Sequence, residues 1–218
     1  MAMAISRRAF LAGIPLAGIG GFAALADLKL NPHTPIDYAL PPEPALSPTP
    51  ECLDHDHHAT HAVTEGPFYK PDTPQRRMLR DAATAGAPLA LRGRVFGEDC
   101  RPLAGAVVDV WSCDGNGVYD NDGYRLRGHQ FTDAAGAFAF ETVKPKDYRN
   151  FGIHRTPHIH VKVQGRDTKL LTTQLYFPGE ALNAQDWFYR DDLLVKLERA
   201  APAEFVASFD FVLRRKTR

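Results

Sequence analysis

The chain has 218 residues, which is enough for one domain with a proper core and leaves little room for a second. Its 26 basic and 26 acidic residues balance, so we exclude nucleic acid and an anionic membrane surface as partners. Glycine and proline, at 17 each, indicate many turns, as an all-β domain needs.

Residues 1–26 have the pattern of an export signal. The pair Arg7-Arg8 precedes an apolar, Gly/Ala-rich run that ends at Ala24-Leu25-Ala26, which resembles a signal-peptidase cleavage site. We therefore expect a cleaved twin-arginine-type signal and a periplasmic or extracellular protein with no stable membrane span. An uncleaved anchor is the alternative, but the run is short and glycine-rich for a span of about 20 strongly apolar residues.

Residues 27–62 are predicted to form a linker and arm. Prolines interrupt residues 31–50 too often for the interior of a helix or sheet. Four of the nine histidines then follow in the stretch His55–His61. This stretch could scavenge metal, but we favour a solvated polar arm, because no periodicity fixes its side chains in space.

Residues 63–218 are predicted to form one folded domain that is mostly β. Short runs of alternating or β-branched residues, separated by Gly- and Pro-rich turns, predict strands at 89–96, 106–111, 128–133, 137–143, 158–163, 170–177 and 205–213. Only two weak helical patterns occur, near 74–85 and 186–198. We therefore predict an all-β sandwich with short helices and a long N-terminal arm.

The three cysteines are Cys52, Cys100 and Cys113. Export would permit disulfides, and an odd count leaves one cysteine over. Because Cys100 and Cys113 flank one predicted strand and the turn before it, they are the preferred pair. None lies in a C-x-x-C motif, which disfavours a cysteine zinc site.

The motif His158-Ile159-His160 lies on a predicted strand. Residues i and i+2 of a strand point to the same face, about 6–7 Å apart at Cα, so both imidazoles can converge on one first-row metal. By itself the motif also fits two exposed histidines on a solvated face.

Two tyrosines, Tyr119 and Tyr148, come directly after turns. No carboxylate or cysteine sits near the histidine pair in the sequence, so phenolates are the remaining candidates for anionic ligands. A phenol with a pKa near 10 binds well only to a strongly Lewis-acidic ion, for which iron(III) is the natural candidate. Each tyrosine taken alone also fits an ordinary core or surface aromatic.

An ordered set of motifs over residues 64–180 resembles the intradiol ring-cleavage dioxygenases, the group of catechol 1,2- and protocatechuate 3,4-dioxygenases. We expect no N-terminal helical domain of the kind found in the catechol 1,2 enzymes, because a proline-rich linker and a histidine-rich arm precede these motifs, and the chain looks closer to a stand-alone, secreted branch. The motifs are Thr64–Tyr69, Gly93–Val95, Cys100–Ala106, Val108–Trp111, Gly117–Tyr119, Arg127–Gly128, Thr132–Gly136, Phe140–Val143, Pro145–Tyr148, Arg155–His160 and Leu171–Phe177.

The resemblance implies a cofactor and its ligands. In the family's pattern, iron(III), Fe(3+), is bound by two tyrosines and two histidines, which match Tyr119, Tyr148, His158 and His160. Tyr148 rests on a looser P-x-x-Y match, so Tyr124 and Tyr176 remain alternative phenolates.

The resemblance also implies catalytic roles. Arg155 would stabilise negative charge on the substrate ring, Gln174 would orient that arginine or the substrate, and Tyr148 would leave the metal and accept a proton when substrate binds. The implied reaction is intradiol cleavage of a catechol-type ring with O2 to a cis,cis-muconic acid-type product, commonly by a homo-oligomer. The alternatives are a secreted β-sandwich protein that binds a ligand or metal without catalysis, and a metal-storage protein that uses the histidine arm.

Overall fold

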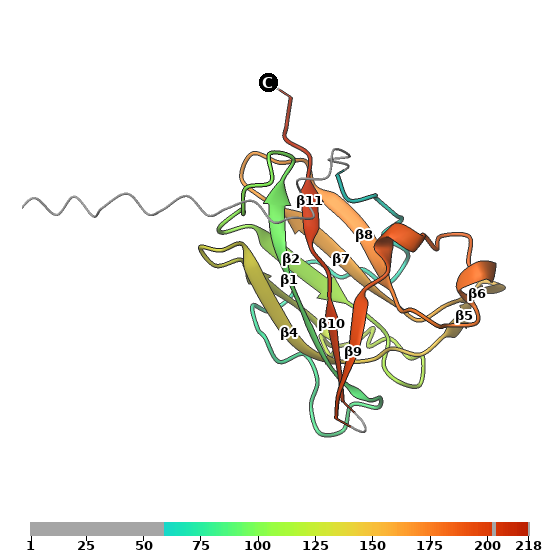
Figure 1. Ribbon diagram of the computed structural model, residues 1–218. Helices are drawn as coiled ribbons and strands as arrows, with labels where there is room; N and C mark the ends of the chain where they lie inside the picture. Colours follow the sequence, from blue (N-terminus) through green and yellow to red (C-terminus); the bar gives the residue numbers. More distant parts are fainter. Residues whose placement is uncertain (1–58, 202–203, 218) are drawn as a thin grey trace, which may run out of the picture. The chain divides into compact units, whose positions relative to one another are not determined.

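The computed structural model describes residues 59–201 and 204–217 of the chain (Figure 1). These residues confirm the predicted all-β fold. The predicted signal, residues 1–26, and most of the arm predicted over residues 27–62 lie outside the described residues. The elements are β1 Pro88–Gly97, β2 Val107–Trp111, β3 Arg127–Phe131, β4 Ala137–Val143, β5 Tyr148–Asn150, β6 Ile153–Arg155, β7 His158–Gln164, β8 Leu171–Tyr176, the short 3-10 turns η2 Asn183–Gln185 and η3 Asp191–Leu193, β9 Lys196–Ala201, β10 Glu204–Ser208 and β11 Phe211–Leu213.

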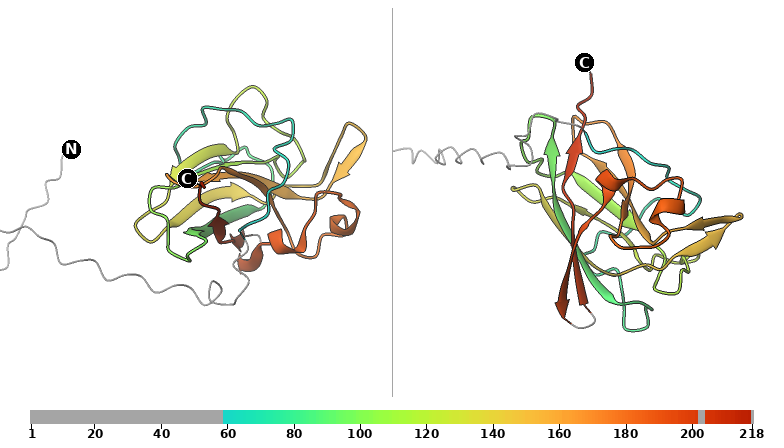
Figure 2. Two further views of the ribbon diagram at one scale, coloured as in Figure 1. Left: turned by 90° about the horizontal axis from the view of Figure 1, so that it is seen from above. Right: turned by 45° about the vertical axis from the view of Figure 1, so that its right-hand side comes forward.

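Two sheets form the sandwich. One has the order β11-β1-β10-β9, with β4 also paired to β1, and the other has the order β3-β2-β7-β8. Strand β1 pairs in parallel with β10 and β11, whereas the neighbours in the second sheet are antiparallel. The hairpin of β5 and β6 belongs to neither sheet and projects from the sandwich (Figure 2).

In the second sheet, successive side chains of a strand point alternately into the core and to the opposite face of the sheet. In β2, Val108 and Val110 pack in the core, while Trp111 belongs to a separate aromatic cluster. In β7, Ile159 packs in the core between His158 and His160, which are absent from it. Burying side chains of the Val and Ile type stabilises the fold by about 1.5–3 kcal/mol each. The same alternation therefore anchors β7 and turns both histidines away from the core.

Both weak helical patterns are wrong. Residues 74–80 run in extended form against the sheets, because Arg76 N donates to His129 O at 3.1 Å and Leu79 N to Glu141 O at 2.9 Å, and a turn follows at residues 82–83. Leu79 also packs in the core. Residues 186–198 contain only the turn η3 and the start of β9, so tertiary hydrogen bonds and packing override weak local propensity.

The strand predicted over 205–213 is split into β10 and β11. At the break, the Asp210 side chain accepts a hydrogen bond from Arg94 N at 2.8 Å. The Asp210 carboxylate thus satisfies a backbone amide of β1 at the point where the parallel pairing of β1 changes from β10 to β11. The short strands β5, β6 and β9 lie outside the predicted set.

The predicted Cys100–Cys113 disulfide is also wrong. Cys113 is buried with a free thiol, which donates to Lys146 O at 3.3 Å. Cys52 lies outside the described residues. Within residues 59–201 and 204–217, no helix has the length and apolar character needed to cross a bilayer.

Candidate metal centre and active site

Strand β7 holds His158 and His160 on one face, as the strand alternation predicts. Both are 1% exposed, and their Nε2 atoms lie 3.1 Å apart. His158 Nδ1 lies 2.7 Å from Thr156 O, a partner that can only accept, so Nδ1 carries the proton and Nε2 presents its lone pair. The His160 ring stacks on Trp111 at 4.8 Å and 6°. Both rings are therefore fixed with Nε2 directed at one point.

A tight turn after β2 brings Tyr119 to the same place. Asp114 Oδ1 accepts hydrogen bonds from Asn116 N at 2.8 Å and Val118 N at 3.0 Å, which closes the turn. Gly117 has a φ of 79°, and a Cβ there would meet Asp147 O at 2.8 Å. Only glycine thus lets this turn approach the segment that leads into Tyr148.

Tyr119 and Tyr148 complete a closed circuit of four rings. Ring centroids are 4.7 Å apart for His158–His160, 6.3 Å for His160–Tyr119, 5.3 Å for Tyr119–Tyr148 and 5.6 Å for Tyr148–His158. Phe68 stacks on Tyr119 at 4.2 Å and supports it from outside the circuit. The structure therefore brings together all four residues that the sequence proposes as metal ligands.

Burial controls the protonation of these groups. It lowers the pKa of His158 to about 3, assisted by nearby Arg155, and the pKa of His160 well below its usual value. Burial also raises the pKa of Tyr119 well above its usual value, with neighbouring Tyr148 as the next cause, and raises that of Tyr148. In the metal-free chain the imidazoles are thus neutral and the phenols protonated.

The donor set fits iron(III). Among the described residues, no three His, Cys, Asp or Glu side chains gather into a metal-binding group, so any four-ligand site here must include the phenols. The Tyr119 hydroxyl is buried without a hydrogen-bond partner. Two neutral imidazoles and two phenols, which become hard anionic ligands on deprotonation, match a strongly Lewis-acidic ion.

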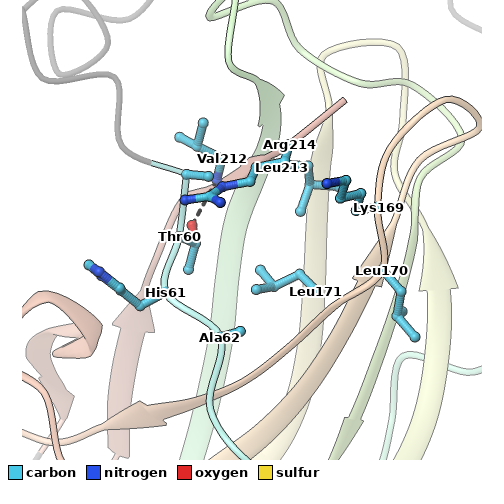
Figure 3. A pocket seen from close by; sticks show the side chains of 10 residues that line it. Thr60, His61, Ala62, Lys169, Leu170, Leu171, Val212, Leu213 and Arg214 are labelled. Carbon is cyan, nitrogen blue, oxygen red and sulfur yellow. Dashed lines mark hydrogen bonds between the residues drawn. The ribbon is translucent and has the colours of Figure 1, made fainter. Parts of the chain in front are cut away.

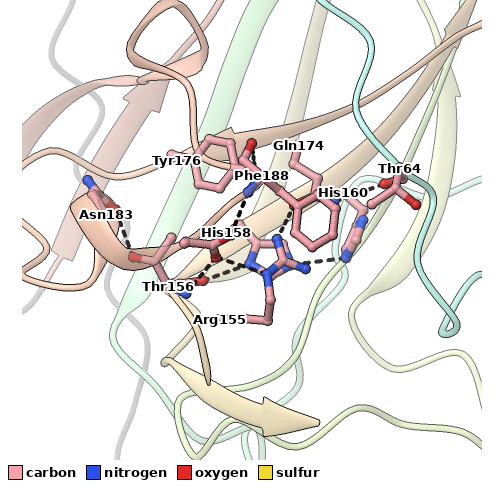
Figure 4. A network of polar contacts seen from close by, with 10 residues as sticks. Thr64, Arg155, Thr156, His158, His160, Gln174, Tyr176, Asn183 and Phe188 are labelled. Atoms are coloured by element: carbon pink, nitrogen blue, oxygen red, sulfur yellow. Dashed lines mark hydrogen bonds and ion pairs between the residues drawn. The ribbon is translucent and has the colours of Figure 1, made fainter. Parts of the chain in front are cut away.

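Arg155 lies beside the circuit in a buried polar network (Figure 4). Its Nε donates to Asp186 Oδ2 at 2.9 Å, and its Nη2 donates to Gln174 Oε1. Asp186 Oδ2 also accepts from Thr156 N at 2.9 Å, and Asp186 Oδ1 accepts from Phe188 N at 3.0 Å. The arginine is thus held by both its predicted partner, Gln174, and a carboxylate.

Sequence reasoning missed Asp186, because it lies in a segment assigned a weak helical pattern and carries no local motif. Its role depends on the loop after β8 folding back on the junction of β6 and β7. The chain of contacts continues through Gln174, whose Nε2 donates to Thr64 O at 2.8 Å.

The two alternative phenolates lie elsewhere. The Tyr124 hydroxyl donates to Pro71 O at 3.1 Å, and no ring contact joins it to the circuit. The Tyr176 ring is 6.0 Å from that of His158, but its hydroxyl lies 2.9 Å from Gln174 Oε1 and 2.8 Å from Phe188 O. The geometry thus favours Tyr119 and Tyr148 as the phenolate pair.

A pocket of about 200 Å³ opens at the circuit. Its lining includes Tyr148 and Arg155, and is completed by Thr64, Gly66, Pro67, Asn150, Phe151, Ile153 and Phe188. A second hollow of about 220 Å³ lies between Ala59–Ala62 and the ends of β8 and β11 (Figure 3). There His61, the one described residue of the histidine-rich stretch that carries an imidazole, contacts the Asp192 carboxylate. Only the first pocket joins the ring circuit.

Comparison with known proteins shows similarity to dioxygenases. A family model described as Dioxygenase matches residues 64–215. A catechol 1,2-dioxygenase of Acinetobacter lwoffii is 33% identical over 165 residues, which are 65% of this chain and 60% of that relative. This chain spans 56% to 60% of the length of that relative and of similar dioxygenases from Candida albicans and a Rhizobium species.

Two solved structures share the fold. One is the dioxygenase domain of a dioxygenase–carbohydrate-binding protein fusion from the cellulolytic bacterium Streptomyces sp. SirexAA-E, with a TM-score of 0.66 and 43% identity over 73% of this chain and 100% of that one. The other is 3-chlorocatechol 1,2-dioxygenase from Rhodococcus opacus 1CP, with a TM-score of 0.68 and 26% identity over 72% of this chain and 73% of that one.

Proposed function

The chain belongs to the intradiol ring-cleavage dioxygenase family, and we propose that it cleaves a catechol-type ring with O2 at an iron(III) centre. The circuit of Tyr119, Tyr148, His158 and His160 is the observation that carries this proposal. The product would be a cis,cis-muconic acid. Because both atoms of O2 enter that product, the reaction needs no external reductant.

Iron(III), when bound by these four residues, would supply the Lewis acidity that lets a catechol bind as its dianion and react with O2. The chain's own residues prepare the ligands. Thr156 O fixes the His158 tautomer, and Trp111 fixes the plane of His160. Burial favours neutral imidazoles, which are the forms that bind a metal.

Tyr148 is the residue that we expect to move a proton. It lines the pocket, whereas Tyr119 is stacked behind Phe68. Because burial raises the pKa of Tyr148, its oxygen holds a proton readily whenever it is not a metal ligand. Starting as a phenolate that had been bound to the metal, Tyr148 would accept a proton from an incoming catechol hydroxyl and keep it at Oη.

Arg155 contributes a fixed positive charge at the pocket wall. Asp186 and Gln174 hold its guanidinium, so the charge needs no reorganisation when negative charge develops on the substrate ring. Gln174 in this arrangement positions the arginine, and Arg155 is the group that faces the pocket.

The proposal is tested by expressing the chain with ample iron and measuring colour, iron content and O2 uptake with catechol. We expect a coloured protein with a tyrosinate-to-iron band and a ring-opened diacid that contains both atoms of isotopically labelled O2. A colourless, iron-free protein would sink the proposal and leave a non-catalytic binding protein. Tyr119→Phe should weaken and shift the band, because one of the two tyrosinates is removed, and Tyr124→Phe is the matched control that should leave the band unchanged.

We also propose that residues 1–26 direct export. Replacing both Arg7 and Arg8 by lysine should retain the protein in the cytoplasm with its N-terminus intact. The exported wild-type protein should begin after Ala26 by mass spectrometry, and recovery of the uncut chain outside the cytoplasm would contradict cleavage.

A further inference from the structure

The β5–β6 hairpin forms one wall of the pocket through a single face. Its register pairs Tyr148 with Arg155 and Asn150 with Ile153, and these four residues all line the pocket. The intervening pair, Arg149 and His154, is absent from the lining. Alternation therefore directs one neutral polar, one apolar and two functional side chains into the pocket, and leaves the other two away from it.

Phe151 at the tip of this hairpin is in an unusual position. Its φ is 46° and that of Gly152 is 79°, which is the two-residue turn with both φ values positive that prefers Asn-Gly or Asp-Gly. An aromatic L residue rarely adopts this conformation. Phe151 is also 87% exposed, yet it lines the pocket. Neither burial nor turn geometry accounts for a phenylalanine here, and such strain is often kept at functional sites.

The size of the pocket indicates what Phe151 could contact. At about 200 Å³ it is smaller than the roughly 300–1,000 Å³ of sites that enclose larger ligands. A diol ring held against Tyr148 and Arg155 at the base of the hairpin would direct a substituent on its far side toward Phe151 at the hairpin tip. Phe151, the half-exposed Ile153 and Pro67 are the exposed apolar residues of the lining, and Phe151 is the most exposed large side chain among them.

The charge of the wall limits that substituent further. Arg155 is the one lining residue with an ionised side chain at neutral pH, and the Asp186 carboxylate balances it at 2.9 Å. In the proposed function the charge of Arg155 serves the reacting ring, so a carboxylate placed over the rim would gain no second cation from this lining and would lie against the apolar side chains of Phe151 and Ile153. An uncharged apolar substituent needs no such cation.

We propose, on the basis of the ring-cleavage function above, that the preferred substrates are catechols with an uncharged, apolar substituent, which Phe151 contacts at the rim. Phe151 is then the specificity-determining residue. It discriminates among diols by the group that lies outside the iron centre, while the reacting ring sits against Tyr148 and Arg155.

The test compares kcat/KM of the iron-loaded full chain for 4-phenylcatechol, catechol and 3,4-dihydroxybenzoate. In the wild type we expect 4-phenylcatechol to match or exceed catechol, and 3,4-dihydroxybenzoate to fall on the order of tenfold below it. Phe151→Asn should lower the ratio of 4-phenylcatechol to catechol by about 3- to 10-fold, because one aromatic contact is removed. Asparagine suits the turn, so this variant should fold at least as well.

Phe131→Thr is the matched control. Phe131 is a half-exposed phenylalanine at the far end of β3, four residues along from Arg127, which neighbours Trp111. The Phe131→Thr variant should leave the ratio of 4-phenylcatechol to catechol unchanged.

An unchanged ratio in Phe151→Asn, or a wild-type preference for 3,4-dihydroxybenzoate, overturns the substrate inference alone. Failure of the iron-loaded wild type to cleave any of the three diols overturns the ring-cleavage function as well. Light scattering should give one oligomeric state for wild type and Phe151→Asn, and a change would assign the ring to an interface instead.

Discussion

The buried pair of Arg155 and Asp186 gives a prediction whose magnitude follows from the structure. Their side chains are 7% and 0% exposed, and the carboxylate also accepts hydrogen bonds from two backbone amides, at Thr156 and Phe188. Removing one partner of such a pair costs about 3–5 kcal/mol, because the other charge stays buried and unpaired. We therefore expect Asp186→Ala to lose about 4 kcal/mol of unfolding free energy.

Because typical domains have only about 5–15 kcal/mol of stability, Asp186→Asn is the more informative variant. It keeps the shape but loses the charge and one acceptor, and we expect a cost of about 2 kcal/mol. Asp186 is no metal ligand in our assignment, so iron content should be retained while kcat for catechol falls. Urea unfolding of the metal-free protein gives the stability, and metal analysis gives the iron content.

A double-mutant cycle decides whether the pair acts as a unit. Combining Asp186→Asn with Arg155→Met removes both charges, so the double variant should be more stable than the sum of the single losses predicts. The two sites are in direct contact, and we expect a coupling of about 1–3 kcal/mol. Single effects that add within about 0.5 kcal/mol would refute the argument that Asp186 positions Arg155 by charge.

Three further predictions concern other buried groups. Burial raises the pKa of the Cys113 thiol to about 12, so native protein at pH 8 should resist iodoacetamide at this residue, read by peptide mass spectrometry, while unfolded protein reacts. Tyr119→Phe removes a buried hydroxyl that lacks a hydrogen-bond partner. Urea unfolding of the metal-free variant should therefore show a stability that is equal to that of the wild type or higher by up to about 1 kcal/mol. A clear loss of stability would reveal a missed partner. Phe140 is fully buried in the core, so Phe140→Ala should cost about 3–5 kcal/mol by the same assay, and a loss below 1 kcal/mol would mean that the core collapses around the gap.

Local patterns predicted the parts of the site that a single element can fix. His158 and His160 share a face because a strand has a period of two, and Ile159 packs in the core as that period requires. Tyr119 could be found because a glycine turn precedes it. Tyr148 was less secure in the sequence because it rested on a looser P-x-x-Y match, and its strand, β5, has only three residues to give a pattern.

Other features depend on segments that meet only in the folded chain. Asp186 contacts Arg155 across 31 positions, and residues 74–80 extend along β3 and β4 because backbone amides there find carbonyls on those strands. The Cys100–Cys113 pairing failed for a related reason, since proximity in sequence does not set the direction of two side chains.

The sequence by itself determined the fold class, the face of β7 that carries the histidines and the kinds of ligand available, because strand period and turn chemistry are local. The tertiary structure decided that two tyrosines, Tyr119 from the turn after β2 and Tyr148 from β5, face those histidines. It also decided that Asp186 and Gln174 hold Arg155, and that the rim of the pocket is apolar. Each of these depends on loop approach and burial, which no local pattern records.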